Sequence, residues 1–143
     1  MSDYEVPEPI ICSPYEEPSH HWLIKEGEPP VLRDGRRESV YFYPTPGDAS
    51  RTDGVTPGTM IELKLVTLIR KRLAEWRNEG YLGATRTTTE LLDYWRRDDR
   101  RHQLFFAQVE AAETVIFLHE ARRDYLQGID VPSDEPSERQ KDA

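Results

Sequence analysis

The sequence predicts a small α+β protein in which an extended acidic segment and a β-ribbon precede long helices. Apolar residues recur at three- and four-residue steps over two long stretches after residue 59, which is the helical period. A run rich in tyrosine, phenylalanine and valine follows a turn-forming pair near residue 35, which is typical of a hairpin. The 143 residues are near the length of one domain, and their composition divides them into 1–30, 31–58, 59–128 and 129–143.

The composition limits the classes of function. Hydrophobic residues make up 36% of the chain and charged residues 32%, and the formal net charge is −8. The chain as a whole is therefore a poor non-specific binder of nucleic acid, and any such contact must be local. The single cysteine, Cys12, has no partner for an internal disulfide. With no leader peptide and no apolar stretch of about 20 residues, we expect a cytoplasmic protein without a membrane span.

Residues 1–30 are predicted to be extended or irregular. They carry seven acidic residues against one lysine, Lys25, and their six prolines exclude a helix of useful length. Residues 31–58 are predicted to be a hairpin and a loop. Val31–Pro44 forms the hairpin, because Asp34 and Gly35 are a favoured turn pair and Ser39–Tyr43 is rich in strand-forming residues. Thr45–Gly58 is then the loop.

Residues 59–128 are predicted to form a helical hairpin. Thr59–Glu62 fits a capping box, and Gly80 is placed to end the first helix. The apolar positions of this helix are Ile61, Leu65, Leu68, Ile69, Leu73 and Trp76. Thr87–Glu90 fits a second capping box, after which one helix to about Tyr125 and a helix broken near Asp98 are equally compatible with the pattern.

The second helical run carries an apolar stripe and ends in a polar tail. The stripe consists of Leu91, Trp95, Phe105, Val109, Ala112 and Ile116. Asp98 and His102 fall on the same stripe, which is why a break is weighed there. Gly128 and Pro132 are expected to stop the helix, and residues 129–143 form a linker or disordered tail.

The stretch Leu104–Leu118 is apolar on nearly every side of a helix. Such a helix must be surrounded, so we expect cover from a further part of the same polypeptide or from a partner. The alternative is that the hairpin and the aromatic side chains of this chain wrap it fully. Three polar residues interrupt the stretch: Gln108, Glu110 and Glu113. Either some of them are buried and pair with an arginine, or they form a narrow solvated stripe on the helix, which is the default expectation.

The residues that could carry chemistry do not complete a site. Asp53, Glu62 and Lys64 have the loose spacing of a metal-dependent nuclease, but that site needs the glutamate and lysine on one face of a strand, and the periodicity here is helical. The four histidines, His20, His21, His102 and His119, lack the spacing of metal ligands. No phosphate-binding glycine loop is present, so we expect no ATP hydrolysis by this chain.

Eight residues are candidates for contacts with a DNA backbone or a protein interface. They are Arg36, Arg37, Arg96, Arg97, Arg100, Arg101, His21 and Trp22. The arginines suit phosphates, but a solvated face paired with nearby aspartates explains the second group equally well. For His21 and Trp22 we favour anchoring of the irregular segment over recognition.

Three blocks of the sequence resemble the region before the motor in Res subunits of type III restriction enzymes, which are helicase-like proteins. The blocks are Ile10–Pro18 with His21 and Trp22, Gly35–Pro44, and Leu104–Thr114. Their ordered succession is more specific than any one block, and together they touch most of residues 10–120. Cys12 and His20 depart from the pattern, in which asparagine and arginine are frequent at these positions.

The resemblance implies a parent enzyme with two RecA-like motor domains, ATP-driven translocation on DNA and a nuclease domain at its far end. ATP and Mg²⁺ would be cofactors of the parent, and its partners would be the remainder of the motor, DNA and the modification methyltransferase subunit. The catalytic, cofactor-binding and metal-binding motifs of the parent would follow Ala143, so this chain is expected to be a non-catalytic fragment. The alternatives are a free-standing protein-protein interaction module with an apolar helix, and a free-standing metal nuclease.

Overall fold

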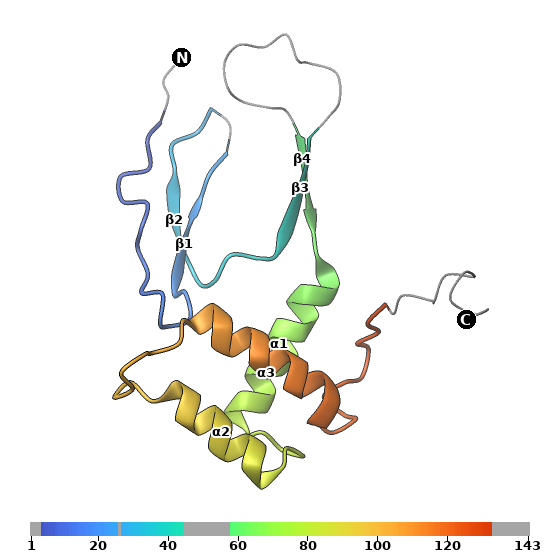
Figure 1. Ribbon diagram of the computed structural model, residues 1–143. Coiled ribbons are helices and arrows are strands. Elements are labelled where there is room, and N and C mark those ends of the chain that lie inside the picture. The colour runs from blue at the N-terminus through green and yellow to red at the C-terminus, as the bar shows by residue number, and fades with distance from the viewer. Residues whose placement is uncertain (1–3, 26, 45–57, 133–143) are drawn as a thin grey trace, which may run out of the picture.

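The computed structural model describes residues 4–25, 27–44 and 58–132, and these form a mixed α+β fold (Figure 1). In chain order the elements are β1 (His20–Leu23), β2 (Val31–Asp34), β3 (Val40–Pro44), β4 (Gly58–Glu62), α1 (Lys64–Asn78), α2 (Arg86–Arg96) and α3 (Phe106–Glu120). The strands form two ribbons on one side of the molecule, and the helices pack together on the other. The second ribbon leads directly into α1.

Each ribbon is a separate two-stranded antiparallel sheet. β1 pairs with β2, and β3 pairs with β4. The outermost pairs of the two registers are His20 with Asp34 and Leu23 with Val31, and Val40 with Glu62 and Pro44 with Gly58. Since a two-stranded ribbon is marginal by itself, each depends on other parts of the protein for cover.

The predicted hairpin over Val31–Pro44 is wrong, although both of its strands exist. Gly35 does follow β2 with a left-handed φ of 85°, but its N–H donates to Ser19 O at 2.6 Å, and the chain then crosses to the second ribbon. The partner of β2 is β1, so the segment up to residue 30, which was predicted to be extended or irregular, contains a paired strand. Strand propensity identified the strands, but it carries no information on which of them pair.

The capping box predicted at Thr59–Glu62 is also wrong. These residues lie in β4, where β3 supplies their backbone partners, and α1 begins only at Lys64. Leu63 is the N-cap and makes no side-chain capping bond; its own N–H donates to Ser39 O at 2.8 Å. The other end of the helix is as predicted, because Gly80 follows α1 with a φ of 79°.

The second helical run is broken, as one of the two predicted alternatives required. α2 ends at Arg96 and α3 begins at Phe106. The N-cap of α2 is Thr85, whose hydroxyl accepts from Thr88 N, so the predicted second capping box lies two residues too late. α3 ends at Glu120 instead of continuing to about residue 125. The helical hairpin is not confirmed either, because α3 contacts both α1 and α2.

The break also displaces the predicted apolar stripe. A wheel drawn through residues 87–125 assumes one continuous helix, and nine residues separate α2 from α3. Leu92 and Phe117 are fully buried, whereas Leu91 and Phe105 are 40% and 47% exposed. The buried face of α3 consists of Val109, which the predicted stripe included, and of Glu113 and Phe117, which it did not.

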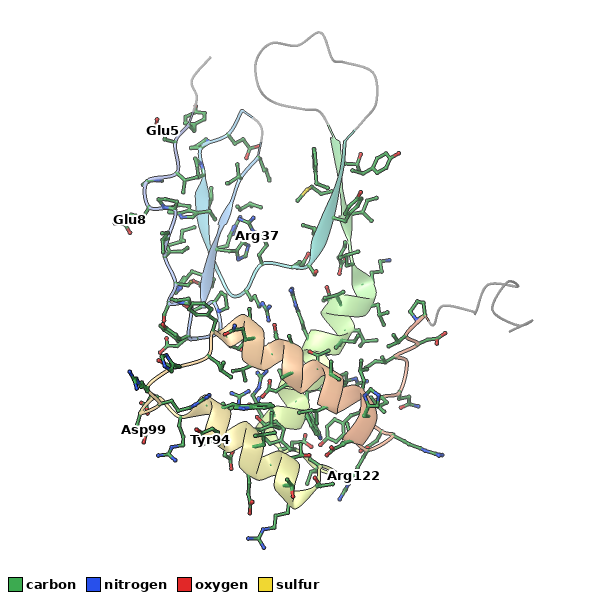
Figure 2. The ribbon with its side chains drawn as sticks, in the orientation of Figure 1. Glu5, Glu8, Arg37, Tyr94, Asp99 and Arg122 are labelled. Atoms are coloured by element: carbon green, nitrogen blue, oxygen red, sulfur yellow. The ribbon has the colours of Figure 1, made fainter. Side chains whose placement is uncertain are left out.

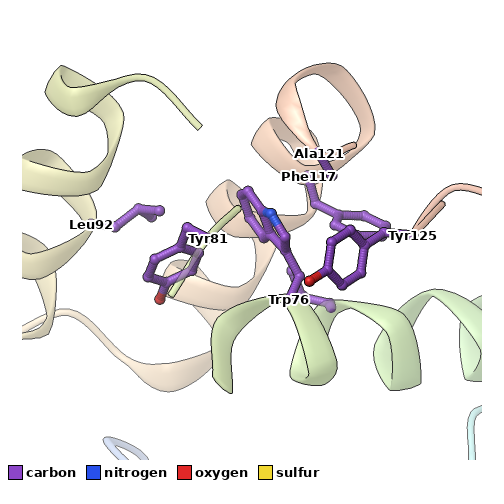
Figure 3. Packing of buried hydrophobic residues seen from close by; sticks show 7 residues of the cluster. Trp76, Tyr81, Leu92, Phe117, Ala121 and Tyr125 are labelled. Atoms are coloured by element: carbon purple, nitrogen blue, oxygen red, sulfur yellow. The ribbon is translucent and has the colours of Figure 1, made fainter. Parts of the chain in front are cut away.

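The core lies between the three helices (Figure 3). Trp76 of α1 is fully buried, and its ring centroid is 4.9 Å from Tyr81 and 5.5 Å from Phe117, both in edge-on geometry. Its indole N–H donates to Leu82 O at 2.9 Å, so its only polar atom is satisfied. Tyr125 closes the cluster after α3, and its hydrogen bond to Glu79 raises the pKa of Tyr125 to about 12.

The described residues do not surround α3. Val115 is 60% exposed and Phe105, at the N-terminal end of the helix, is 47% exposed, so the alternative in which this chain wraps the apolar helix fully is not seen in the described part. The expectation that something else packs here stays a prediction. None of the helices described is long and apolar enough to cross a membrane.

Two glycines with left-handed backbones allow a matched test of local packing. A Cβ at Gly83, φ 96°, would lie 2.9 Å from Glu120 O, whereas a Cβ at Gly80, φ 79°, would meet nothing within 4 Å. We expect Gly80→Ala to lower the free energy of unfolding by about 1–2 kcal/mol, the cost of a left-handed alanine. Gly83→Ala adds overpacking and should cost at least about 1 kcal/mol more. Equal losses in urea unfolding would contradict the close approach of residue 83 to the end of α3.

Candidate functional site

A buried glutamate lies at the centre of the helical core. Glu113 of α3 has no exposed surface. Its carboxylate accepts hydrogen bonds from Arg77 of α1 at 2.6 and 3.2 Å, from the Tyr81 hydroxyl at 2.8 Å, and from Arg96 of α2. The sequence places this residue one turn after Val109 on the buried face of α3, so the carboxylate enters the core with the apolar side chains. The prediction of a solvated stripe is therefore wrong for Glu113. The alternative prediction, a buried carboxylate that pairs with an arginine, is confirmed for this residue.

Tyr81 is held in a strained backbone conformation beside this glutamate. Its φ is 60°, in the left-handed region that is uncommon for residues other than glycine. Two contacts keep it there: its ring packs on Trp76, and its hydroxyl donates to Glu113. The tight turn after α1 thus places the hydroxyl group of Tyr81 beside the buried carboxylate of Glu113.

A second arginine–carboxylate pair lies one turn earlier on α3. Arg36, from the connection between the two ribbons, donates to both oxygens of Glu110 at 2.5 and 2.7 Å. Both side chains are largely buried, with 24% and 14% exposed. The hydrogen bond to Glu110 raises the pKa of Arg36 above its usual value, whereas burial lowers the pKa of Arg96. Glu110, like Glu113, thus meets an arginine.

Glu17 and Phe106 connect the two pairs. The carboxylate of Glu17 lies 3.9 Å from Arg36 and 4.0 Å from Arg77. The guanidinium carbons of the same two arginines lie 5.4 and 6.0 Å from the centroid of the Phe106 ring. We call the connected set the arginine–glutamate network. Its charged members are Glu17, Arg36, Arg77, Arg96, Glu110 and Glu113.

The network is balanced, with three arginines and three glutamates, and it joins the N-terminal segment to all three helices. Replacing such a buried set by apolar residues can be neutral, but removing one partner leaves an uncompensated charge. The network therefore specifies which segments pack together more than it adds net stability. Arginine donors occupy the oxygens of Glu110 and Glu113, so these two carboxylates hold segments in place.

The first group of predicted contact residues anchors the irregular segment. The Trp22 indole donates to Glu8 O at 2.7 Å, and Arg37 donates to Trp22 O at 2.5 Å. The His21 ring is hydrogen-bonded through Nδ1 to Gly35 O at 2.8 Å. These contacts agree with the favoured anchoring role for His21 and Trp22. Arg37 lies between the two ribbons in the view of Figure 2 and keeps part of its guanidinium exposed.

The second group of predicted arginines separates into Arg96, which joins the network, and three residues outside it. Arg96 belongs to the network. Arg97 pairs with Asp99 at 2.5 Å, as the solvated-face alternative required, and Arg100 stacks over Tyr94 at 4.7 Å. Arg101 is exposed. A DNA contact for these three residues stays a prediction.

Two of the three residues in the nuclease hypothesis do not have the relative placement that such a site needs. Glu62 is the last residue of β4, and Lys64 is the first residue of α1, so they do not share a face of one strand. The capping role expected of Glu62 is wrong for the same reason. Asp53 lies outside the described residues. No group of three potential metal-binding side chains was found in the part of the chain that the structure describes, which includes all four histidines.

Three members of the site were missed in the sequence: Glu17, Arg77 and Tyr81. Arg77 follows the core residue Trp76 directly and carried no separate signal. The one available signal was the position of Glu113 in an apolar helix, which requires a cation from another element. These features define the class of the protein, which is a small α+β unit whose segments are joined by an internal arginine–glutamate network. No family model matches the chain, and no curated protein or solved structure matches it either.

Proposed function

We propose that the chain is the N-terminal accessory segment of a Res subunit of a type III restriction enzyme, and that it packs on the first motor domain without taking part in catalysis. The parent would use ATP and Mg²⁺ to translocate on DNA and would work with a modification methyltransferase subunit. Within it, the arginine–glutamate network would keep this segment in one shape while the motor moves.

The contacts among the three resembling blocks carry this proposal. The first and third blocks meet where Phe106 N donates to Pro14 O at 2.9 Å and where the rings of Tyr15 and Phe105 lie 5.4 Å apart. The second and third meet in the bidentate pair of Arg36 and Glu110. Segments 92 and 74 residues apart in the chain are thus in contact, as the proposal requires of blocks that belong to one unit.

The exposed apolar surface supports a docking role. Five apolar side chains of the β3–β4 ribbon are between 45% and 60% exposed, and Val115 of α3 is 60% exposed. The ribbon residues are Tyr41, Phe42, Tyr43, Met60 and Ile61. In the proposal, these exposed side chains contact another protein surface, as exposed apolar patches can do. In the proposed parent, the motor domain supplies that surface.

The genomic DNA immediately downstream of the Ala143 codon tests the proposal first. A continuing or frameshifted frame that encodes a Gly-rich phosphate-binding loop ending in Gly-Lys-Ser or Gly-Lys-Thr supports a restriction helicase. A stop codon followed by unrelated sequence contradicts it. That result would favour the second candidate, a free-standing interaction module, for which the same exposed ribbon and α3 would be the binding surface.

A substitution on the exposed side of α3 tests docking in the longer protein. We expect Val115→Asp to reduce DNA-stimulated ATPase activity at least tenfold, because it buries a charge against the motor. The control is Val131→Asp, at a valine that is 50% exposed outside α3, which should leave the activity within about twofold. Unchanged ATPase activity in Val115→Asp would contradict docking through this face.

A further inference from the structure

A basic pocket lies at the junction of the two ribbons and α1. Its volume is about 440 Å³, and its charged or titratable lining residues are His20, His21, Arg36, Arg37, Glu38 and Arg70. These residues come from β1, from the connection after β2 and from the first half of α1. The sequence had suggested Arg36 and Arg37 as candidates, but the fold adds Arg70 from more than thirty residues further along the chain.

Described contacts hold the lining residues of the pocket in place, and they leave some N–H donors of these residues without a described partner. Arg36 is fixed by Glu110. Arg37 donates through one nitrogen to Trp22 O, and most of its five N–H groups have no further partner among the described residues. The His21 ring is oriented by its Nδ1 contact with Gly35 O. Arg70 makes no ion pair with any other described residue.

The charge of the lining favours an anion. Three arginines face one carboxylate, Glu38, in a chain whose net charge is −8. Arg36 is paired with Glu110, so among the described residues Arg37 and Arg70 supply the remaining positive charge, against the single carboxylate of Glu38. Arginine binds phosphate oxygens through paired N–H donors. Three of the lining residues, His20, Arg37 and Glu38, are exposed, and an open hollow suits one segment of a polyanion better than an enclosed small molecule.

We propose that this pocket binds a phosphate of the DNA backbone through Arg37 and Arg70. The choice of DNA rests on the proposed function. The site would allow a strongly acidic protein to contact DNA at one defined place. Local binding of this kind adds positioning without sequence recognition.

The experiment measures the binding of a fluorescein-labelled 20-base-pair DNA duplex to the 143-residue chain by anisotropy at 50 mM salt. We expect the double variant Arg37→Ala with Arg70→Ala to bind roughly tenfold more weakly, with a shallower dependence of affinity on salt. Arg37→Ala alone, at an exposed side chain, should lose roughly threefold and leaves the helices untouched. No measurable binding by the unmodified chain would overturn the proposal.

The matched control is Arg86→Ala with Arg123→Ala, which removes the same two charges at exposed residues that do not line the pocket. This control should change the affinity for the duplex no more than about twofold. An equal loss of affinity in both double variants would show that binding depends only on the overall charge of the chain, and it would overturn the proposal. Inorganic phosphate at 5 mM should not displace the duplex; displacement would assign the pocket to free phosphate. Binding of DNA by this chain does not need the motor. If a stop codon follows Ala143 and binding still depends on the pocket, the proposed function is contradicted, but the proposal for the pocket is supported.

Discussion

Glu113→Ala is expected to lower the free energy of unfolding by about 3–5 kcal/mol. The substitution leaves the guanidinium groups of Arg77 and Arg96 and the hydroxyl of Tyr81 without their shared acceptor. Arg77 is only 16% exposed, so water replaces the lost partner poorly. Because a domain has only about 5–15 kcal/mol of stability, the variant should be close to unfolding at room temperature. Urea unfolding followed by circular dichroism measures the change.

The control for this prediction is Glu90→Ala. Glu90 also pairs with an arginine, Arg86, four residues away on α2, but both side chains are well exposed at 63% and 92%. Such pairs contribute only about 0.2–0.5 kcal/mol. If Glu113→Ala and Glu90→Ala cost the same, then Glu113 is solvated in solution and the network is not a structural centre.

Trp76→Ala is expected to cost about 3–5 kcal/mol, the range for deleting a large buried aromatic side chain. Trp76 is fully buried and contacts the rings of Tyr81 and Phe117, so its removal leaves a cavity where the connection after α1 meets α3 (Figure 3). It also leaves Leu82 O without its donor. Thermal unfolding should show the loss as a lower midpoint, with the helical circular dichroism of the folded baseline retained.

Tyr94→Ala serves as the matched aromatic substitution. Tyr94 lies on α2 and is 49% exposed, and its described ring contact is with the Arg100 guanidinium. We expect a cost below about 1 kcal/mol. A cost for Trp76→Ala no larger than that for Tyr94→Ala would mean that the three helices do not pack around Trp76 as described.

Local signals predicted the helices better than the strands. The end of the first helix at Gly80 is present as predicted, and the break near Asp98 is one of the two alternatives that the sequence left open. Both depend on backbone preferences within a few residues. The pairing of β2 depends on where β1 lies, and Thr59–Glu62 became a strand because β3 lies alongside it. Pairing of this kind joins segments that are distant in sequence, so no local pattern contains it.

The sequence by itself determined that carboxylates stand within an apolar helix, and it left open whether they are buried against an arginine or form a solvated stripe. Only the tertiary structure decided that Glu113 is the carboxylate at the centre and that Arg77, Arg96 and Tyr81 meet it. The physical reason is that burial depends on the faces that three helices present to one another. The same packing brought Arg70 beside Arg37 at the basic pocket, although the two residues are far apart in the chain.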